Sequence, residues 1–221
     1  MVRGSSCPAF IRYWSWFSRL HYGTADPEWV QRLQKACWII EADLDALGSG
    51  LAPENSSQGT AFYLKDVGLV TCDHALSEHA CVYNPQEPHK RFPAKVLARS
   101  STLDIAILEP PVDPGVWLEK GRPEKLRRMD LVTLAGYPQF APGHSLSVVV
   151  GKVSGIHIVS TIKLASIDTP IIKGNSGAPV LDPANRVVGI AVRGADQANV
   201  LESPTLFGVV LISELDRLVR K

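Results

Sequence analysis

The chain has 221 residues, of which 45% are hydrophobic and 20% are charged, and its formal net charge is +1. This composition excludes an intrinsically disordered chain and is typical of a globular protein that buries a core. The balanced charge gives no overall field that would attract nucleic acid or an anionic membrane. There is no apolar run near the ~20 residues of a transmembrane helix and no leader-like pattern. We therefore expect no nucleic-acid partner, no membrane span and a cytoplasmic location.

The N-terminal part has a helical pattern. Apolar residues recur at helical spacing over 27–47, "PEWVQRLQKACWIIEADLDAL", and "GSG" follows directly. The sequence predicts a helix over this range, within a helical N-terminal extension over 1–50. The aromatic cluster of Trp14, Trp16 and Phe17 is compatible with contact to a membrane surface or a partner, although packing against the domain is favoured. The extension is thus a candidate docking segment for a regulatory protein.

A loop over 51–58, "LAPENSSQ", is expected to follow, and from Gly59 onward the pattern changes to short β-type runs. They are separated by Gly, Pro, Asn and Asp at close intervals, which indicates an all-β sandwich or a pair of barrels over 51–221. The runs are "TAFYL", "GLVTC", "ACVYN", "FPAKVLA", "IAILEP", "LVTLAGY", "HSLSVVVGKVSGI", "KLASID", "GAPVLD", "VVGIAV" and "LFGVVLI". The amphipathic segment "SELDRLVRK" predicts a short C-terminal helix.

The four cysteines are too few and too scattered for a disulfide framework, so we expect them to be reduced. The segment "TCDHALSEHAC" places two cysteines and two histidines close together, and all four are able to bind zinc. Their spacing differs from the usual zinc knuckle, in which paired ligands are about two to four residues apart. These residues are Cys72, His74, His79 and Cys81. We predict no metal and no other cofactor.

Ser176 lies in the glycine-rich stretch "KGNSGAPV" (173–180). Serine in such a stretch is usually a turn residue, because glycine supplies a positive φ and serine bonds its own backbone. The alternative is a nucleophile, with glycines that allow successive N–H groups to point at one spot beside the hydroxyl. That interpretation requires a base and a residue that orients the base.

His74 and Asp104 are the candidates for these two roles. A neutral imidazole suits proton abstraction near pH 7, and His74 follows the apolar run "VGLVTC", where a strand would end at a cleft. Asp104 begins the run "DIAILEP", and an acid beside so much apolar sequence is costly without a strong partner. A turn or capping aspartate is the simpler interpretation of Asp104. The order His74, Asp104, Ser176 nevertheless matches one of the known orders of a Ser-His-Asp triad.

Together these segments resemble the trypsin-like serine peptidases, in particular the bacterial branch with HtrA-type and glutamyl-endopeptidase-type enzymes. The resemblance runs from about residue 59 to 218. It is carried by "GTAFYLKDVGLVTCDHAL", "LDIAILEP", "AGYP" followed by "VVVGKVSGI", and "SIDTPIIKGNSGAPVLDPANRVVGIAV". It implies two six-stranded β-barrels with the catalytic cleft between them.

The resemblance also implies residue roles: His74 as general base, Asp104 as its orienter and Ser176 as nucleophile. The backbone N–H groups of Gly174 and Ser176 would form the oxyanion hole, with Asn175 shaping the loop between them. In the digestive enzymes of this family, an aspartate just before the nucleophilic serine forms an activating ion pair with a newly cut N-terminus. Asn175 occupies that position here and is neutral, so it cannot form this ion pair. The site is then either permanently formed or set by a partner.

The residues that would bind the substrate side chain are the three before the nucleophile loop (the stretch 173–180 that carries Ser176) and three of a later strand. They are Pro170, Ile171, Ile172, Ala191, Val192 and Arg193. With no acid at the base of this pocket, cleavage after Lys or Arg is disfavoured. We expect a small or medium apolar residue at the cut site, and Arg193 leaves an acidic one open.

The predicted function is a serine endopeptidase that cleaves protein or peptide substrates through an acyl-enzyme intermediate. The apparent cytoplasmic character and the N-terminal extension are compatible with a partner-activated effector of a bacterial defence or stress system, such as an antiviral one. The alternative is a catalytically silent module that keeps the fold and binds peptides or protein partners.

Overall fold

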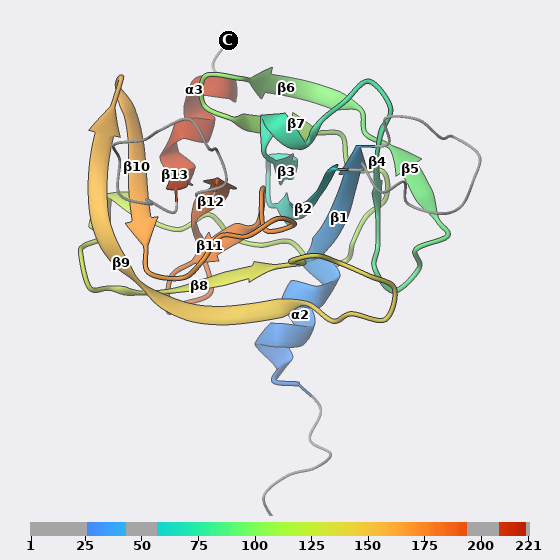
Figure 1. Ribbon diagram of the computed structural model, residues 1–221, viewed down its shortest axis with the longest axis horizontal. Coiled ribbons are helices and arrows are strands. Elements are labelled where there is room, and N and C mark those ends of the chain that lie inside the picture. The colour runs from blue at the N-terminus through green and yellow to red at the C-terminus, as the bar shows by residue number, and fades with distance from the viewer. Residues whose placement is uncertain (1–25, 43–56, 194–207, 220–221) are drawn as a thin grey trace, which may run out of the picture.

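A computed structural model of the chain describes residues 26–42, 57–193 and 208–219 (Figure 1). A helix, α2 (Glu28–Ala36), leads directly into the first sheet. The strands of that sheet are β1 (Cys37–Ala42), β2 (Ser57–Leu64), β3 (Gly68–Thr71), β4 (Ala80–Tyr83), β5 (Arg91–Pro93), β6 (Val96–Ser100) and β7 (Ile105–Leu108). They pair in the order β5-β4-β1-β2-β3-β7-β6.

The second sheet is a closed barrel. Its strands are β8 (Leu131–Gly136), β9 (Ser147–Val159), β10 (Ile162–Ile167), β11 (Pro179–Leu181), β12 (Val187–Arg193) and β13 (Gly208–Leu211). They close in the order β10-β13-β12-β11-β8-β9. Figure 1 shows the two sheets side by side, the first in blue to green and the second mainly in yellow to red.

The predicted all-β fold is confirmed, with one difference in the first half. The second unit is the expected six-stranded barrel, whereas the first is a seven-stranded sheet whose end strands, β5 and β6, do not pair within the described residues. Each of the eleven predicted β runs contains a strand, and "FPAKVLA" contains parts of two, β5 and β6. The extra strand is β1, which the sequence pattern assigned to a helix.

The helix predicted over 27–47 is wrong beyond Ala36. Residues 37–42, "CWIIEA", form β1, which pairs with β2 on one side and β4 on the other. All six residues of β1 are buried, so neither face of this segment meets water as one face of an amphipathic helix does. The aromatic and β-branched run Trp38–Ile40 suits such a strand. Even the charged Glu41 is accommodated, because the Nη1 of Arg91 lies 2.6 Å from its Oε2.

The described part of the helix predicted over 213–221, which extends to residue 219, contains less α-helix than expected. A 3-10 turn, η3 (Ile212–Leu215), precedes a single α-helical turn, α3 (Asp216–Val219). Two further 3-10 turns lie in loops: η1 (Asp73–Ala75) and η2 (Pro123–Lys125). No helix in the described part of the chain is long and apolar enough to cross a membrane.

The core joins the two sheets. One hydrophobic cluster contains residues of α2 and the first sheet together with residues near β8, such as Tyr137 and Phe140, and residues of β11 and β12, such as Leu181 and Ile190. A second, smaller cluster fills the closed barrel. The loops that carry the candidate site therefore extend from rigid, fully packed elements.

Candidate active site

His74 and Asp104 are brought together by neighbouring strands. His74 lies in η1 just after β3, and Asp104 lies just before β7. Because β3 and β7 are antiparallel, with Thr71 opposite Ala106, the end of one strand meets the start of the other. Asp104 itself has a φ of 54°, a left-handed conformation that aspartate tolerates better than most residues.

Both oxygens of the Asp104 carboxylate contact His74. The Nδ1 of the imidazole lies 2.7 Å from Oδ2, and the backbone N–H of His74 donates to Oδ1 at 2.9 Å. A carboxylate only accepts hydrogen bonds, so this contact favours a proton on Nδ1, and in the neutral imidazole Nε2 is then the acceptor. The imidazole is thereby held in the tautomer that a general base requires.

Two glycines shape the loop that carries Ser176. Gly174 has a φ of 96° and Gly177 a φ of 85°, a region that favours glycine. A Cβ at Gly174 would overlap the carbonyl oxygen of Tyr137, and one at Gly177 would overlap the carbonyl oxygen of Thr60. Backbone conformation and space thus require glycine at both positions, which gives a structural reason for the "GNSG" sequence.

The backbone N–H groups of this loop alternate between bonded and free. Asn175 donates to the carbonyl of Ile172 at 2.9 Å, and Gly177 donates to that of Ala191 at 2.6 Å. In contrast, the N–H groups of Gly174 and Ser176 have no acceptor among the residues that the structure describes. These are the two donors that the sequence interpretation assigned to the oxyanion hole.

The peptide units that carry these two free N–H groups are held from their carbonyl ends. The carbonyl of Lys173 accepts a hydrogen bond from Gln139 at 2.9 Å, and the carbonyl of Asn175 accepts one from Ala178 at 2.9 Å. Because a peptide unit is planar, fixing its carbonyl also fixes the direction of its N–H. Both donors are therefore oriented before any ligand arrives.

The nucleophile loop lies against the residues that flank His74. A Cβ on Gly59 would be 2.9 Å from the carbonyl oxygen of Ser176 and 3.3 Å from the Cβ of Ala75. The side chains of His74 and Ser176, both described, form no hydrogen bond, and Nε2 of His74 instead lies 3.6 Å from the Sγ of Cys72. Catalytic hydrogen bonds are often long or misaligned before substrate binds. The pair His74–Asp104 is thus assembled, and the backbone of Ser176 lies near Ala75, the residue after His74, with no hydrogen bond between the His74 and Ser176 side chains.

Cys72 is a neutral thiol in this arrangement. Its side chain is fully buried, and burial, reinforced by the negative charge of Asp104, raises its pKa well above the ordinary value. A thiolate is the nucleophilic form of cysteine. Despite its contact with the imidazole, Cys72 is therefore poorly suited to replace Ser176 as the nucleophile.

The predicted substrate-binding residues differ in solvent exposure. Pro170 and Ile172 are exposed, the latter by 43%. Ile171, Ala191 and Val192 are buried, and the first two belong to the core of the closed barrel. The side chain of Arg193 lies outside the described residues. Among the described side chains of this set, Pro170 and Ile172 are the ones that reach the surface.

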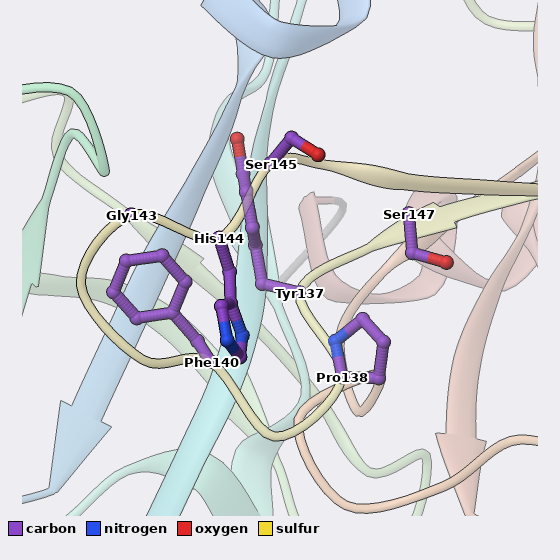
Figure 2. Close-up of a pocket in the computed structure, with 7 residues that line it drawn as sticks. All are labelled: Tyr137, Pro138, Phe140, Gly143, His144, Ser145 and Ser147. Atoms are coloured by element: carbon purple, nitrogen blue, oxygen red, sulfur yellow. The ribbon is translucent and has the colours of Figure 1, made fainter.

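A cavity of about 390 Å³ lies in the loop between β8 and β9, which the sequence analysis did not single out (Figure 2). Figure 2 shows the rings of Phe140 and His144 close together on this loop. The loop is tied to the nucleophile loop by the hydrogen bond from Gln139 to Lys173. Its sequence, "YPQFAPGHS", marks a Pro- and Gly-rich loop but contains no signal for a cavity.

The residues weighed as zinc ligands do not form a metal site. Within residues 26–42, 57–193 and 208–219, no three His, Cys, Asp or Glu side chains gather so that they could hold a metal ion. His74, a member of that set, is paired with Asp104 instead.

Comparison with known proteins gives the family. The family model described as "Trypsin-like peptidase domain" matches residues 59–190, more than half of the chain. The chain belongs to this family of trypsin-like peptidases, as the sequence motifs predicted.

Curated relatives are longer proteins. The chain is 32% identical over 147 residues to "Protease Do-like 2, chloroplastic" of Arabidopsis thaliana, an alignment that covers 62% of the chain and 24% of the relative. It is 26% identical over 139 residues to "Probable periplasmic serine endoprotease DegP-like" of Chlamydia trachomatis serovar D, which covers 60% and 27%. The chain thus spans about a quarter of the length of these relatives.

Solved structures agree on the fold. The active form of the Rv3671c protease from M. tuberculosis superposes with a TM-score of 0.68 at 21% identity, covering 90% of this chain and 88% of that one. The HtrA-type protease AlgW with a tripeptide gives a TM-score of 0.67 at 20% identity, covering 88% and 63%. Both confirm the double-barrel architecture of the trypsin-like fold.

Proposed function

We propose that this domain is a serine endopeptidase that hydrolyses peptide bonds in protein substrates. The observation that carries the proposal is the 2.7 Å contact between His74 and Asp104, together with a loop whose Gly174 and Ser176 N–H groups are oriented and have no acceptor in the described part of the chain. Membership in the trypsin-like peptidase family supports the same reaction class.

In the proposed reaction, the Oγ of Ser176 attacks the scissile carbonyl carbon while its proton passes to Nε2 of His74. The carboxylate of Asp104 stabilises the imidazolium, and the N–H groups of Gly174 and Ser176 bind the developing oxyanion. Collapse of the tetrahedral intermediate breaks the C–N bond, and the imidazolium protonates the leaving amine. Water then attacks the acyl-enzyme ester by the same route, which releases the carboxylic acid and restores Ser176.

The proposed preference at the cut site is a small or medium apolar residue. The exposed residues Pro170 and Ile172, just before the nucleophile loop, offer an apolar surface. No acidic residue occurs among 170–176 to pair with a substrate Lys or Arg. A peptide-library profile dominated by cleavage after Lys or Arg would contradict this preference.

The cytoplasmic location, the regulatory partner of residues 1–50, and the role in bacterial defence or stress stay predictions. The names of the relatives include chloroplastic and periplasmic proteins, so family membership does not favour one compartment. The second candidate function is a silent peptide-binding module. It is favoured by one observation, the missing hydrogen bond between His74 and Ser176.

Labelling of the purified protein with a fluorophosphonate probe separates the two functions. We expect the wild type to be labelled and both Ser176→Ala and His74→Ala to lose at least about 10⁴-fold in labelling rate, because removing a member of a triad disables the nucleophile. Ser145→Ala and His79→Ala change exposed residues of the same types and should keep the wild-type rate. A folded wild type that is not labelled would support the binding module instead.

A further inference from the structure

The buried residue Thr60 contacts the nucleophile loop at two points. Thr60 lies in β2 of the first sheet and is completely inaccessible to solvent. Its backbone N–H donates to the carbonyl of Ser176 at 2.8 Å, and its hydroxyl donates to the carbonyl of Gly174 at 2.7 Å. One residue of the first sheet therefore holds both residues whose N–H groups would bind the oxyanion.

The hydroxyl of Thr60 acts both as a donor and as an acceptor. It has one proton, which it gives to Gly174, and its oxygen accepts the N–H of Tyr137 at 3.0 Å. Tyr137 begins the loop whose residue Gln139 holds the carbonyl of Lys173. The hydroxyl thus connects β2, the nucleophile loop and the β8–β9 loop.

The Gly174 carbonyl that Thr60 binds belongs to the peptide unit between the two free N–H groups. Rotation of that unit would change the backbone angles on both sides of it, and hence the directions of the N–H groups of Gly174 and Ser176. Its own N–H, on Asn175, is bonded to Ile172, so the hydroxyl of Thr60 fixes the opposite end. The backbone N–H of Thr60 binds the carbonyl of Ser176 and so fixes the peptide unit between Ser176 and Gly177.

We propose that Thr60 is a positioning residue of the oxyanion hole, which it sets by anchoring the nucleophile loop to the first sheet. The inference rests on the proposed peptidase function and extends it to a residue that touches no substrate. Thr71 provides the contrast. It is equally buried and its hydroxyl also donates to a backbone carbonyl, at 2.8 Å, but that carbonyl belongs to Thr60 and not to the nucleophile loop.

The test compares Thr60→Val, Thr60→Ser and the matched control Thr71→Val. The readouts are the melting temperature, the fluorophosphonate labelling rate, and kcat and KM for the p-nitrophenyl ester of an N-acylated alanine. We expect Thr60→Val to lower kcat by about 10²-fold with KM changed by no more than about twofold, because small errors in a preorganised site cost about that much. Thr60→Ser keeps the hydroxyl and should recover most of the rate.

Thr71→Val loses a buried hydrogen bond of the same kind and should lower the melting temperature while kcat stays within about threefold. Should Thr60→Val fail to fold, the pair Thr60→Ser and Thr60→Ala, which differ by the hydroxyl alone, gives the same comparison. Equal losses of kcat in Thr60→Val and Thr60→Ser would overturn the inference while leaving the proposed function intact, because the loss would then not depend on the hydroxyl. A folded wild type that reacts with neither probe would overturn the proposed function and the inference with it.

Discussion

At the scale of single residues, Asp104 determines which nitrogen of His74 carries the proton. In Asp104→Asn, the side-chain N–H₂ can donate a hydrogen bond to Nδ1. The proton of the neutral imidazole then lies on Nε2, which can no longer act as a base. We expect kcat to fall by about 10³- to 10⁴-fold with little change in folding. The measurement is the pH dependence of kcat for the same ester substrate, together with the fluorophosphonate labelling rate.

The neighbouring Asp73→Asn is the control for this prediction. Asp73 directly precedes His74 and is buried, but its carboxylate pairs with the Nε of Arg99 at 2.6 Å and not with the imidazole. Arg99 is half exposed, so losing this pair should cost about 1 kcal/mol or less of stability and leave kcat close to the wild type. Equal losses of activity in the two variants would show that Asp104 acts through general stability and not through the tautomer.

The sequence identified the candidate triad but not the residues that orient it. His74, Asp104 and Ser176 each border a β run or a glycine turn, so local pattern and chain order were sufficient to find them. In the sequence pattern, Thr60 is indistinguishable from an ordinary strand residue. Its importance comes from a hydrogen bond to a residue 114 positions away, a contact that no local pattern contains. Ile171 and Ala191 were assigned to the substrate pocket from sequence position alone. The structure buries both in the core of the closed barrel, and this burial depends on tertiary packing that the sequence pattern does not contain.

At the scale of elements, β1 shows that residues 37–42, which lie within the first 50, are part of the sheet of the peptidase fold. The apolar residues of 37–42 satisfy a helical pattern and a buried strand equally well, because both of their faces are apolar. Tertiary pairing decides between the two: β2 and β4 provide partners on both edges of β1. A boundary at residue 50, as the sequence suggested, separates β1 from the sheet in which it is an interior strand.

Truncation tests this role of β1. A chain that lacks residues 1–50 should fail to fold, because it loses an interior strand and buried residues such as Ile39 and Ile40. A chain that begins at residue 26 retains every element that the structure describes and is the matched control. Circular dichroism and the melting temperature of both chains give the result. A cooperatively folded, fluorophosphonate-reactive chain without residues 1–50 would contradict the assignment of β1 to the fold.

At the scale of the whole molecule, the all-β class and the double-barrel topology were predictable, but the closure of each sheet was not. Strand positions follow from the short apolar runs and the turn residues between them. Closure depends on which strand edges meet, as β10 meets β13 in the second barrel. The first sheet gains β1 and remains open between β5 and β6 in the described part of the chain. These pairings join residues far apart in sequence.

The shared core predicts that the two sheets unfold together. The larger hydrophobic cluster contains residues of both sheets, so one sheet cannot unfold without exposing apolar surface of the other. Cys37 and Cys72, both in the part of the core near the first sheet, report this event. Burial raises the pKa of each thiol well above its ordinary value, so at pH 8 neither is a thiolate in the folded protein, and unfolding makes both reactive.

We therefore expect labelling of Cys37 and Cys72 by a thiol reagent, followed by peptide mapping along a urea series, to begin where circular dichroism detects loss of the whole β fold. The less buried Cys81 should be labelled at lower urea and serves as the internal control for reagent access. Labelling of Cys37 and Cys72 well before the circular dichroism transition would mean that the first sheet opens independently. In that case the contacts of Thr60 with Gly174 and Ser176 would break before the closed barrel unfolds, and peptidase activity should disappear with the first transition.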